Sequence, residues 1–110
     1  MANTFLRKTS RNIGTSTTVV GGYTVGANTA TTVIGLTCAN RTTAAITVDV
    51  KHNDGTYDTF IVKGATVPAG GSLVVVGGDQ KVVLEAGDSV KVTSSAATSC
   101  DVIMSILEIT

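Results

Sequence analysis

The chain has 110 residues, a length that suits one domain with a modest core and is too short for two. Only 15% of the residues are charged and the formal net charge is zero, so overall charge does not predict attraction to nucleic acid or to acidic partners. Apolar residues make up 43% of the chain, with valine and isoleucine prominent, beside 12 glycines and one proline. Stiff β-branched side chains and frequent turn residues favour strands over helices.

The weak charge also bears on how the protein behaves in solution, because a neutral chain has little self-repulsion to keep copies apart. This composition is typical of a protein whose surface is partly covered in an assembly. It fits equally well a small soluble monomer with a threonine-coated surface. No apolar run approaches the length of a membrane-spanning helix, so no membrane partner is predicted. Residues 1–15 lack the apolar core of a secretory signal, and synthesis in the cytoplasm is expected.

Residues 1–12 are predicted to be an N-terminal arm in front of a domain over residues 13–110. The arm is polar and basic, with two apolar side chains that would anchor it on a partner or on its own domain. Five of its residues are candidate contacts with a partner: Phe5, Leu6, Arg7, Lys8 and Arg11.

Charge is unevenly distributed along the chain. Residues 1–48 hold four basic side chains and no acidic one, whereas all eight acidic residues lie from Asp49 onward. Complementary charge predicts that the arm of one copy docks on the acidic surface of a neighbour. Charge compensation inside one sandwich is the alternative, and we favour it for Arg41. Three basic residues without aromatic platforms do not predict specific nucleic-acid binding.

Short β-branched runs separated by turn residues predict about eight strands. The alternation at Ile46, Val48 and Val50 predicts inward-facing side chains, and Asn53-Asp54-Gly55 predicts a hairpin turn. The expected strands span 13–20 with a continuation at 23–25 past a glycine bulge, 32–40, 44–52, 57–63, 73–76, 81–84, 89–93 and 101–109. This pattern is typical of an all-β fold, a single antiparallel β-sandwich of the jelly-roll or immunoglobulin-like type.

The last expected strand, 101–109, is apolar on both faces. Val102, Met104 and Ile106 lie on one face. A strand of this kind is either central in a closed sandwich or buried against another subunit. The opposite face supplies three further candidate interaction residues: Ile103, Leu107 and Ile109.

No motif predicts a catalytic, cofactor-binding or metal-binding residue. His52 is the only histidine and is expected to be a surface residue beside a turn, and no serine stands in a Gly-x-Ser-x-Gly elbow. The spacing of Asp49, Asp54 and Asp58 does not match an EF-hand loop for Ca²⁺. The glycine pairs lack the lysine and the helix of a phosphate-binding loop. We therefore expect a protein that is not an enzyme and uses no cofactor.

The two cysteines, Cys38 and Cys100, have no Cys or His nearby at metal-ligand spacing. Cys38 is expected to share an inward face with Ile34 and Leu36, so it is predicted to be a small core residue. A bond between the two cysteines is geometrically possible, but a reducing cytoplasm disfavours it.

Three segments of the chain resemble small structural proteins of tailed-bacteriophage virions, notably those of phages of marine cyanobacteria. The segments are Arg7-Lys8-Thr9-Ser10-Arg11-Asn12-Ile13-Gly14-Thr15, then Val33-Ile34-Gly35-Leu36-Thr37 with Ala39-Asn40, and residues 67–110. The third contains Pro68-Ala69-Gly70, Gly77-Gly78-Asp79-Gln80-Lys81, Leu84-Glu85-Ala86-Gly87-Asp88 and Leu107-Glu108-Ile109-Thr110. The resemblance covers essentially the whole chain, and its motifs are turn and strand residues without chemistry. Cys100 stands where we expect a small residue such as Ala or Ser.

The resemblance implies a non-enzymatic part of a virion, made in the host cytoplasm and repeated around a symmetry axis as a homo-oligomer. We favour the head–tail region, where neck or collar subunits form a ring around the connector, or the tail. A capsid decoration or cement protein, whose arm clips neighbouring capsomers, is the alternative. The implied partners are further copies of the chain and the portal or connector, tail or major capsid protein. A soluble glycan-binding or adhesion module is a third class, although aromatic residues make up only 4% of the chain.

Overall fold

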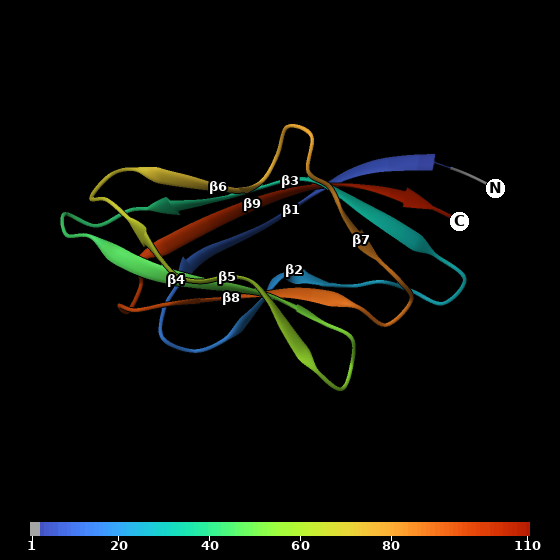
Figure 1. Ribbon diagram of the computed structural model, residues 1–110, viewed down its shortest axis with the longest axis horizontal. Helices are drawn as coiled ribbons and strands as arrows, with labels where there is room; N and C mark the ends of the chain where they lie inside the picture. Colours follow the sequence, from blue (N-terminus) through green and yellow to red (C-terminus); the bar gives the residue numbers. More distant parts are fainter. Residues whose placement is uncertain (1–2) are drawn as a thin grey trace.

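The computed structural model describes residues 3–110, and this range forms nine β-strands and no helix (Figure 1). Within it, therefore, no helix is long and apolar enough to cross a membrane. The strands are β1 (Asn3–Ile13), β2 (Thr18–Thr24), β3 (Ala30–Asn40), β4 (Ile46–Asn53), β5 (Asp58–Val67), β6 (Ser72–Val76), β7 (Val82–Leu84), β8 (Ser89–Ser94) and β9 (Cys100–Ile109). The expected strands correspond to β2–β9, and β1 is additional.

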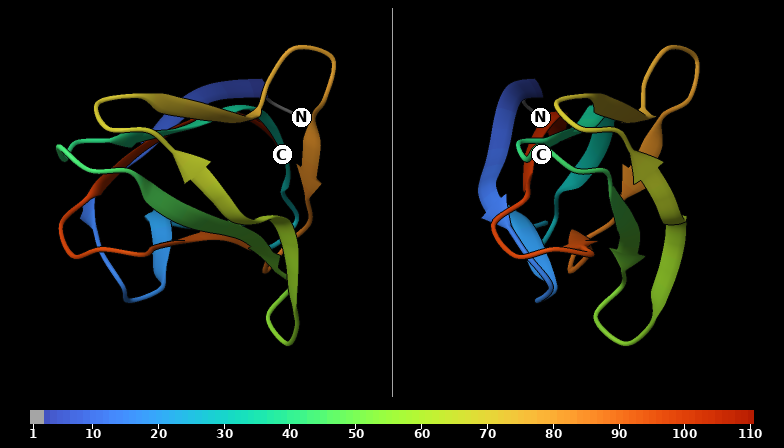
Figure 2. Two further views of the ribbon diagram at one scale, coloured as in Figure 1. Left: turned by 60° about the vertical axis from the view of Figure 1, so that its left-hand side comes forward. Right: turned by 90° about the vertical axis from the view of Figure 1, so that its left-hand side faces the viewer.

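Two antiparallel sheets pack face to face, which confirms the predicted β-sandwich (Figure 2). The first sheet has the strand order β1-β9-β3-β6, and β7 also pairs with β3. β6 lies beside residues 36–39 of β3 and β7 beside residues 31–33, so the two short strands follow one another along the same edge. The second sheet has the order β2-β8-β4-β5.

The core lies between the sheets and is built from alternate residues of the strands. On β4 the prediction is confirmed, since Ile46, Val48 and Val50 are all buried. Opposite them, β9 contributes Met104 and Ile106, which are also fully buried. Burial of this many β-branched and leucine side chains is the main stabilising contribution to a sandwich of this size.

Most of the segment predicted as an arm lies along its own domain. β1 is an edge strand that pairs antiparallel with β9, from Asn3 opposite Ile109 to Ile13 opposite Cys100. Residues 1–2 lie outside the described range. In the single chain, therefore, the described part of the arm is the outermost strand of the first sheet.

The strand predicted over 13–20 is wrong in its first half. β1 ends at Ile13, residues 14–17 form a loop between the two sheets, and β2 begins at Thr18. A Cβ atom added at Gly14 would lie 3.2 Å from the backbone of Ala97, so a residue with a side chain would be crowded at this point of the loop. The glycine bulge in β2 is confirmed, because Gly21 and Gly22 both have positive φ and the register with β8 shifts across them.

The prediction that Ile34 shares an inward face with Cys38 is wrong. The pairing of β3 with β9 shifts register between Val33 and Gly35, and this irregularity inserts one extra residue into the strand. Val33 and Leu36 are therefore both buried, while Ile34 is only partly buried. A strand with period-two alternation cannot bury residues three apart without such a shift.

Candidate interaction surface

The outer face of the first sheet carries two apolar rows that run across the strands. Row one joins Phe5 of β1, Leu107 of β9, Thr32 of β3 and Val83 of β7, which are successive register partners. Phe5 is 74% exposed and Val83 is 64% exposed. Their chain neighbours on β1 and β7, which include Leu6, pack against the core, so these side chains point outward.

Row two lies further along the same strands. It joins Thr9, Ile103, Thr37 and Val74, which again are register partners on β1, β9, β3 and β6. Ile103 is 50% exposed and Val74 is 64% exposed.

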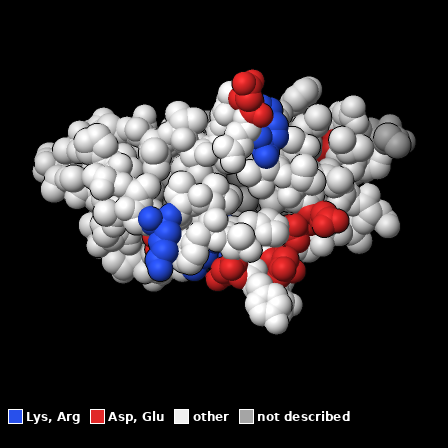
Figure 3. Space-filling model, viewed as in Figure 1, with Lys and Arg blue, Asp and Glu red and all other residues white. Residues whose placement is uncertain are grey.

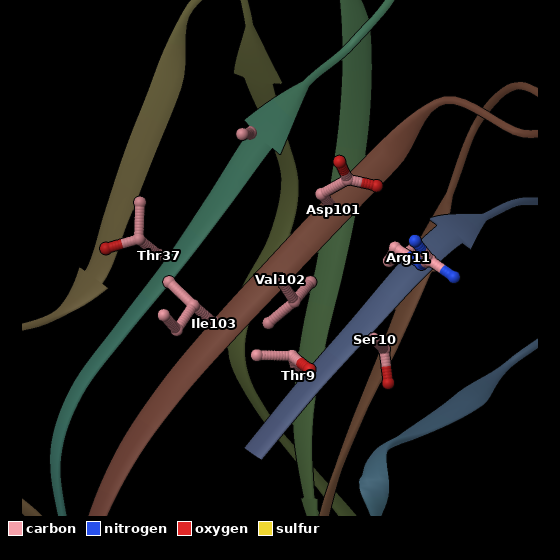
Figure 4. A pocket seen from close by; sticks show the side chains of 8 residues that line it. Thr9, Ser10, Arg11, Thr37, Asp101, Val102 and Ile103 are labelled. Carbon is pink, nitrogen blue, oxygen red and sulfur yellow. The ribbon is translucent and has the colours of Figure 1, made fainter. Parts of the chain in front are cut away.

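A shallow depression of about 320 Å³ includes Thr9, Ile103 and Thr37 of row two, and Arg11 and Asp101 lie at one end of it. Figure 4 shows Thr9, Ile103 and Thr37 on three adjacent strands, with Arg11 and Asp101 beyond them. Its lining is mostly apolar or hydroxyl-bearing, so this depression is suited to van der Waals contact and not to charge chemistry.

Between the two apolar rows lies a row that carries charge only at its edges. Arg7 of β1 is opposite Ser105 of β9, which is opposite Gly35 of β3. At the level of Arg7, the edge of the sheet opposite β1 is formed by the loop of residues 77–81, because β6 ends beside Leu36 and β7 begins beside Val33. This β6–β7 loop stands out from both sheets (Figure 1).

The outer face of the second sheet differs sharply in composition. Lys51 of β4 is opposite Lys91 of β8 on one side and Phe60 of β5 on the other, and its ammonium lies 3.5 Å from the Asp58 carboxylate. Asp49 faces outward between two buried valines and accepts a hydrogen bond from the backbone. In Figure 3 most charged side chains of the visible face lie in its lower half, on the side of β4, β5 and β8. The first sheet therefore presents the more apolar outer face, although Phe60 of the second sheet is 45% exposed.

The structure divides the five candidate arm residues between the two faces of β1. Phe5, Arg7 and Arg11 are exposed on the outer face, whereas Leu6 packs against the core and Lys8 points inward. The Lys8 ammonium lies 5.1 Å from the centre of the Tyr23 ring, a cation–π contact within the chain. Lys8 is thus positioned to hold β1 on its own domain.

Tyr23 occupies a buried polar site beneath the first sheet. Its hydroxyl donates to the Glu108 carboxylate at 2.6 Å and lies 2.7 Å from the Thr31 hydroxyl. Burial raises the pKa of the tyrosine, and the hydrogen bond to Glu108 raises it further. Glu108 is consequently turned inward and adds no charge to the apolar face.

The candidate residues of the last strand lie on the same face as the outer residues of the arm. Ile103, Leu107 and Ile109 alternate with the buried residues of β9 and point outward, although Leu107 and Ile109 are partly covered. Sequence reasoning missed the edge residues Val74 and Val83, because each belongs to a short β-branched run whose exposed member cannot be identified without the register.

Other residues named from the sequence have structural roles. Arg41 pairs with Asp101 at 3.3 Å, which confirms the compensation favoured for it. His52 lies beside the turn as expected and is partly exposed, and its Nε2 lies 2.8 Å from the carboxylate of the buried Asp88. Asp88 also accepts a hydrogen bond from the backbone N–H of Glu85 and so stabilises its own turn.

The two cysteines are buried and unbonded in adjacent strands. The prediction for Cys38 is confirmed, because its thiol is fully buried. A hydrogen bond with the Cys100 thiol, together with burial, raises the pKa of Cys38 well above its ordinary value. A protonated, covered thiol is a poor nucleophile and a poor metal ligand.

Two features complete the description of the surface. Backbone N–H groups of Tyr57 and Thr56 lower the pKa of the exposed Asp54 carboxyl in the β4–β5 hairpin. Within residues 3–110, no group of three or more His, Cys, Asp or Glu side chains could hold a metal ion.

Comparison with known proteins adds the following. No protein family and no curated protein matches the chain. A subunit of the disulfide-linked pili that form Bacillus endospore appendages has a similar fold, with 14% sequence identity and a TM-score of 0.52, over 100% of this chain and 91% of that chain. A pentameric capsid protein from metagenomic phage sequences matches 94% of this chain and 59% of that one at 21% identity, with a TM-score of 0.40. At these identities the first likeness concerns the fold alone, and the second is too weak to support a conclusion.

Proposed function

We propose that this protein is a non-enzymatic structural subunit of a tailed-phage virion, repeated around a symmetry axis at the head–tail connection or in the tail. The observation that carries the proposal is the asymmetry between the two outer faces. One sheet exposes two mainly apolar rows, with Phe5, Val74 and Val83 each more than half exposed, and the other exposes lysines, carboxylates and threonines around one large apolar side chain, Phe60. An exposed apolar surface with polar surroundings is typical of a face covered in an assembly.

The resemblance of the sequence to small virion proteins supports the same function and supplies its location. The similar pilus subunit shares its fold with the whole of this chain. Its likeness extends to the fold alone, so it does not favour a pilus over a virion. Capsid decoration is the alternative placement within the virion, because the same apolar face could lie on a capsid surface.

The position of the chain in phage particles tests the proposal. In the density of particles that contain the protein, we expect about twelve or fewer copies at one vertex, as a closed ring requires, or closed rings in the tail. Hundreds of copies across the shell would instead identify the chain as a capsid decoration or cement protein. A protein that is absent from purified particles, and that remains a monomer which binds glycans in a titration, would contradict the virion function altogether.

A further inference from the structure

We infer that the outer face of the first sheet binds a second copy of the same face, about a two-fold axis that runs along the strands between β9 and β3. The inference rests on the proposed function only for its premise that copies of the chain assemble. The geometry of the face determines the partner and the orientation.

The apolar rows are self-complementary in this arrangement. A two-fold axis along the strands places β1 of one copy over the β6–β7 edge of the other and β9 over β3. Phe5 then lies over Val83 of the second copy, because both belong to row one, and Thr9 lies over Val74 in row two. Phe5 and Val83, at opposite edges of one molecule, thus cover each other in the pair, and Val74 is covered by Thr9.

The charged side chains between row one and row two favour the same two-fold axis. Arg7 projects from the β1 edge at the level of the β6–β7 loop, where Asp79 and Lys81 are both exposed and the Lys81 ammonium donates to the Gly78 carbonyl of its own loop. Neither Arg7 nor Asp79 has an ion-pair partner among residues 3–110. The proposed axis brings Arg7 of each copy to Asp79 of the other, so the contact occurs twice. An axis across the strands at the level of Arg7 would instead place the two Arg7 side chains against each other, and like charges oppose that arrangement.

The area of the face is sufficient for a specific pair. β9 has ten residues, which at about 3.3 Å per residue extend about 33 Å, and four strands spaced about 4.8 Å apart cover about 19 Å. A face of about 600 Å² on each copy buries about 1,200 Å² in total, the lower bound for specific interfaces. Aligned packing of two sheets keeps their strands within about 30° of parallel, which this axis allows.

Charge reversal tests the orientation. The purified chain, the single variants Arg7→Asp and Asp79→Arg, and the double variant would be compared by sedimentation velocity over a concentration series. We expect a monomer–dimer equilibrium for the wild type and a Kd raised about tenfold or more in each single variant, because a like-charge contact occurs twice in each dimer. The double variant should return to within a few-fold of the wild type.

Two controls keep the result interpretable. Lys63→Asp reverses an exposed charge on the second sheet and should leave the Kd unchanged. Far-ultraviolet circular dichroism and thermal melts of each variant check that the monomer folds, since Arg7 and Asp79 make no ion pair within the chain.

Three outcomes would overturn the inference. These are a wild type that stays monomeric up to about 100 µM, single variants with the wild-type Kd, and a double variant as weak as the single ones. Each of them leaves the virion function in place, because that function is decided by the position of the chain in particles and not by its self-association in solution.

Discussion

Two isoleucines of β9 allow the assignment of inner and outer faces to be tested within one strand. Ile106 is fully buried in the core, whereas Ile103, three residues earlier, is 50% exposed on the outer face. Replacing each with alanine removes the same atoms from two different environments. Ile106→Ala loses the transfer free energy of a buried side chain and leaves a cavity, at a cost of about 2–5 kcal/mol.

The expected cost at Ile103 is much smaller. Full burial of an isoleucine side chain contributes about 1.5–3 kcal/mol, and half burial without a cavity implies about 1 kcal/mol. A domain of this size has a total stability of about 5–15 kcal/mol. At about 4 °C per kcal/mol, Ile106→Ala should lower the melting temperature by about 8–20 °C and Ile103→Ala by about 4 °C.

Urea unfolding followed by circular dichroism measures both values. The measurements belong at micromolar or lower concentration, and at two concentrations, because association through the outer face would add apparent stability to the folded state. Equal losses of stability at the two positions would refute the register of β9 on which the apolar face depends. A loss below about 1 kcal/mol at Ile106 would refute its place in the core.

Three further predictions concern the turns and the buried thiols. Gly21→Ala should destabilise the protein by more than the roughly 1 kcal/mol expected for Gly22→Ala, because both residues have positive φ but only at Gly21 would the added Cβ lie 2.7 Å from a side chain, that of Lys8. Equal losses of stability in urea unfolding would contradict the packing of β1 on β2. Cys38 should resist alkylation in the folded protein and react at the rate of a free thiol in denaturant, as followed by mass spectrometry. Fast labelling of the native protein would contradict the burial of this thiol. The hairpin around Asp54 should loosen as the pH falls below 3.8, the ordinary pKa of this carboxyl, because the backbone N–H of Tyr57 lowers its pKa in the folded protein and the stabilisation is lost when the carboxylate is protonated. Asp54→Asn should abolish the pH-dependent change in the amide NMR shifts of the hairpin, and a change that persists in this variant would belong to another carboxyl.

Much of the fold was predictable because it depends on local patterns. The β-branched runs and the turns at Asn53-Asp54-Gly55 and Ala86-Gly87-Asp88 place most strands within a few residues of their observed bounds. The exceptions have non-local causes. Ile34 leaves the inward face because of an irregularity in the pairing of β3 with β9. Gly35 beside it is a local sign of a bulge, but only the pairing of the strands shows where the register shifts.

The candidate surface was predictable only in part. Ile103 was identified because β9 is apolar on both faces, and Phe5 because it is an apolar residue in a basic segment. Neither observation shows that Phe5 and Leu107 are neighbours, since their contact depends on the pairing of the first strand with the last. The inward position of Lys8 was also missed, because alternation along β1 has meaning only once the core side is known.

The sequence by itself determined that the chain forms strands, where most of its turns lie, and that it carries no recognisable catalytic motif, because these follow from side-chain stiffness, glycine and residue spacing. Only the tertiary structure decided which apolar residues are covered and which remain exposed. Period-two alternation separates two faces of a strand but does not say which one meets the other sheet. The pairing of β1, β9, β3 and β7 resolved this, and it aligned Phe5 and Val83 at opposite ends of one exposed apolar row.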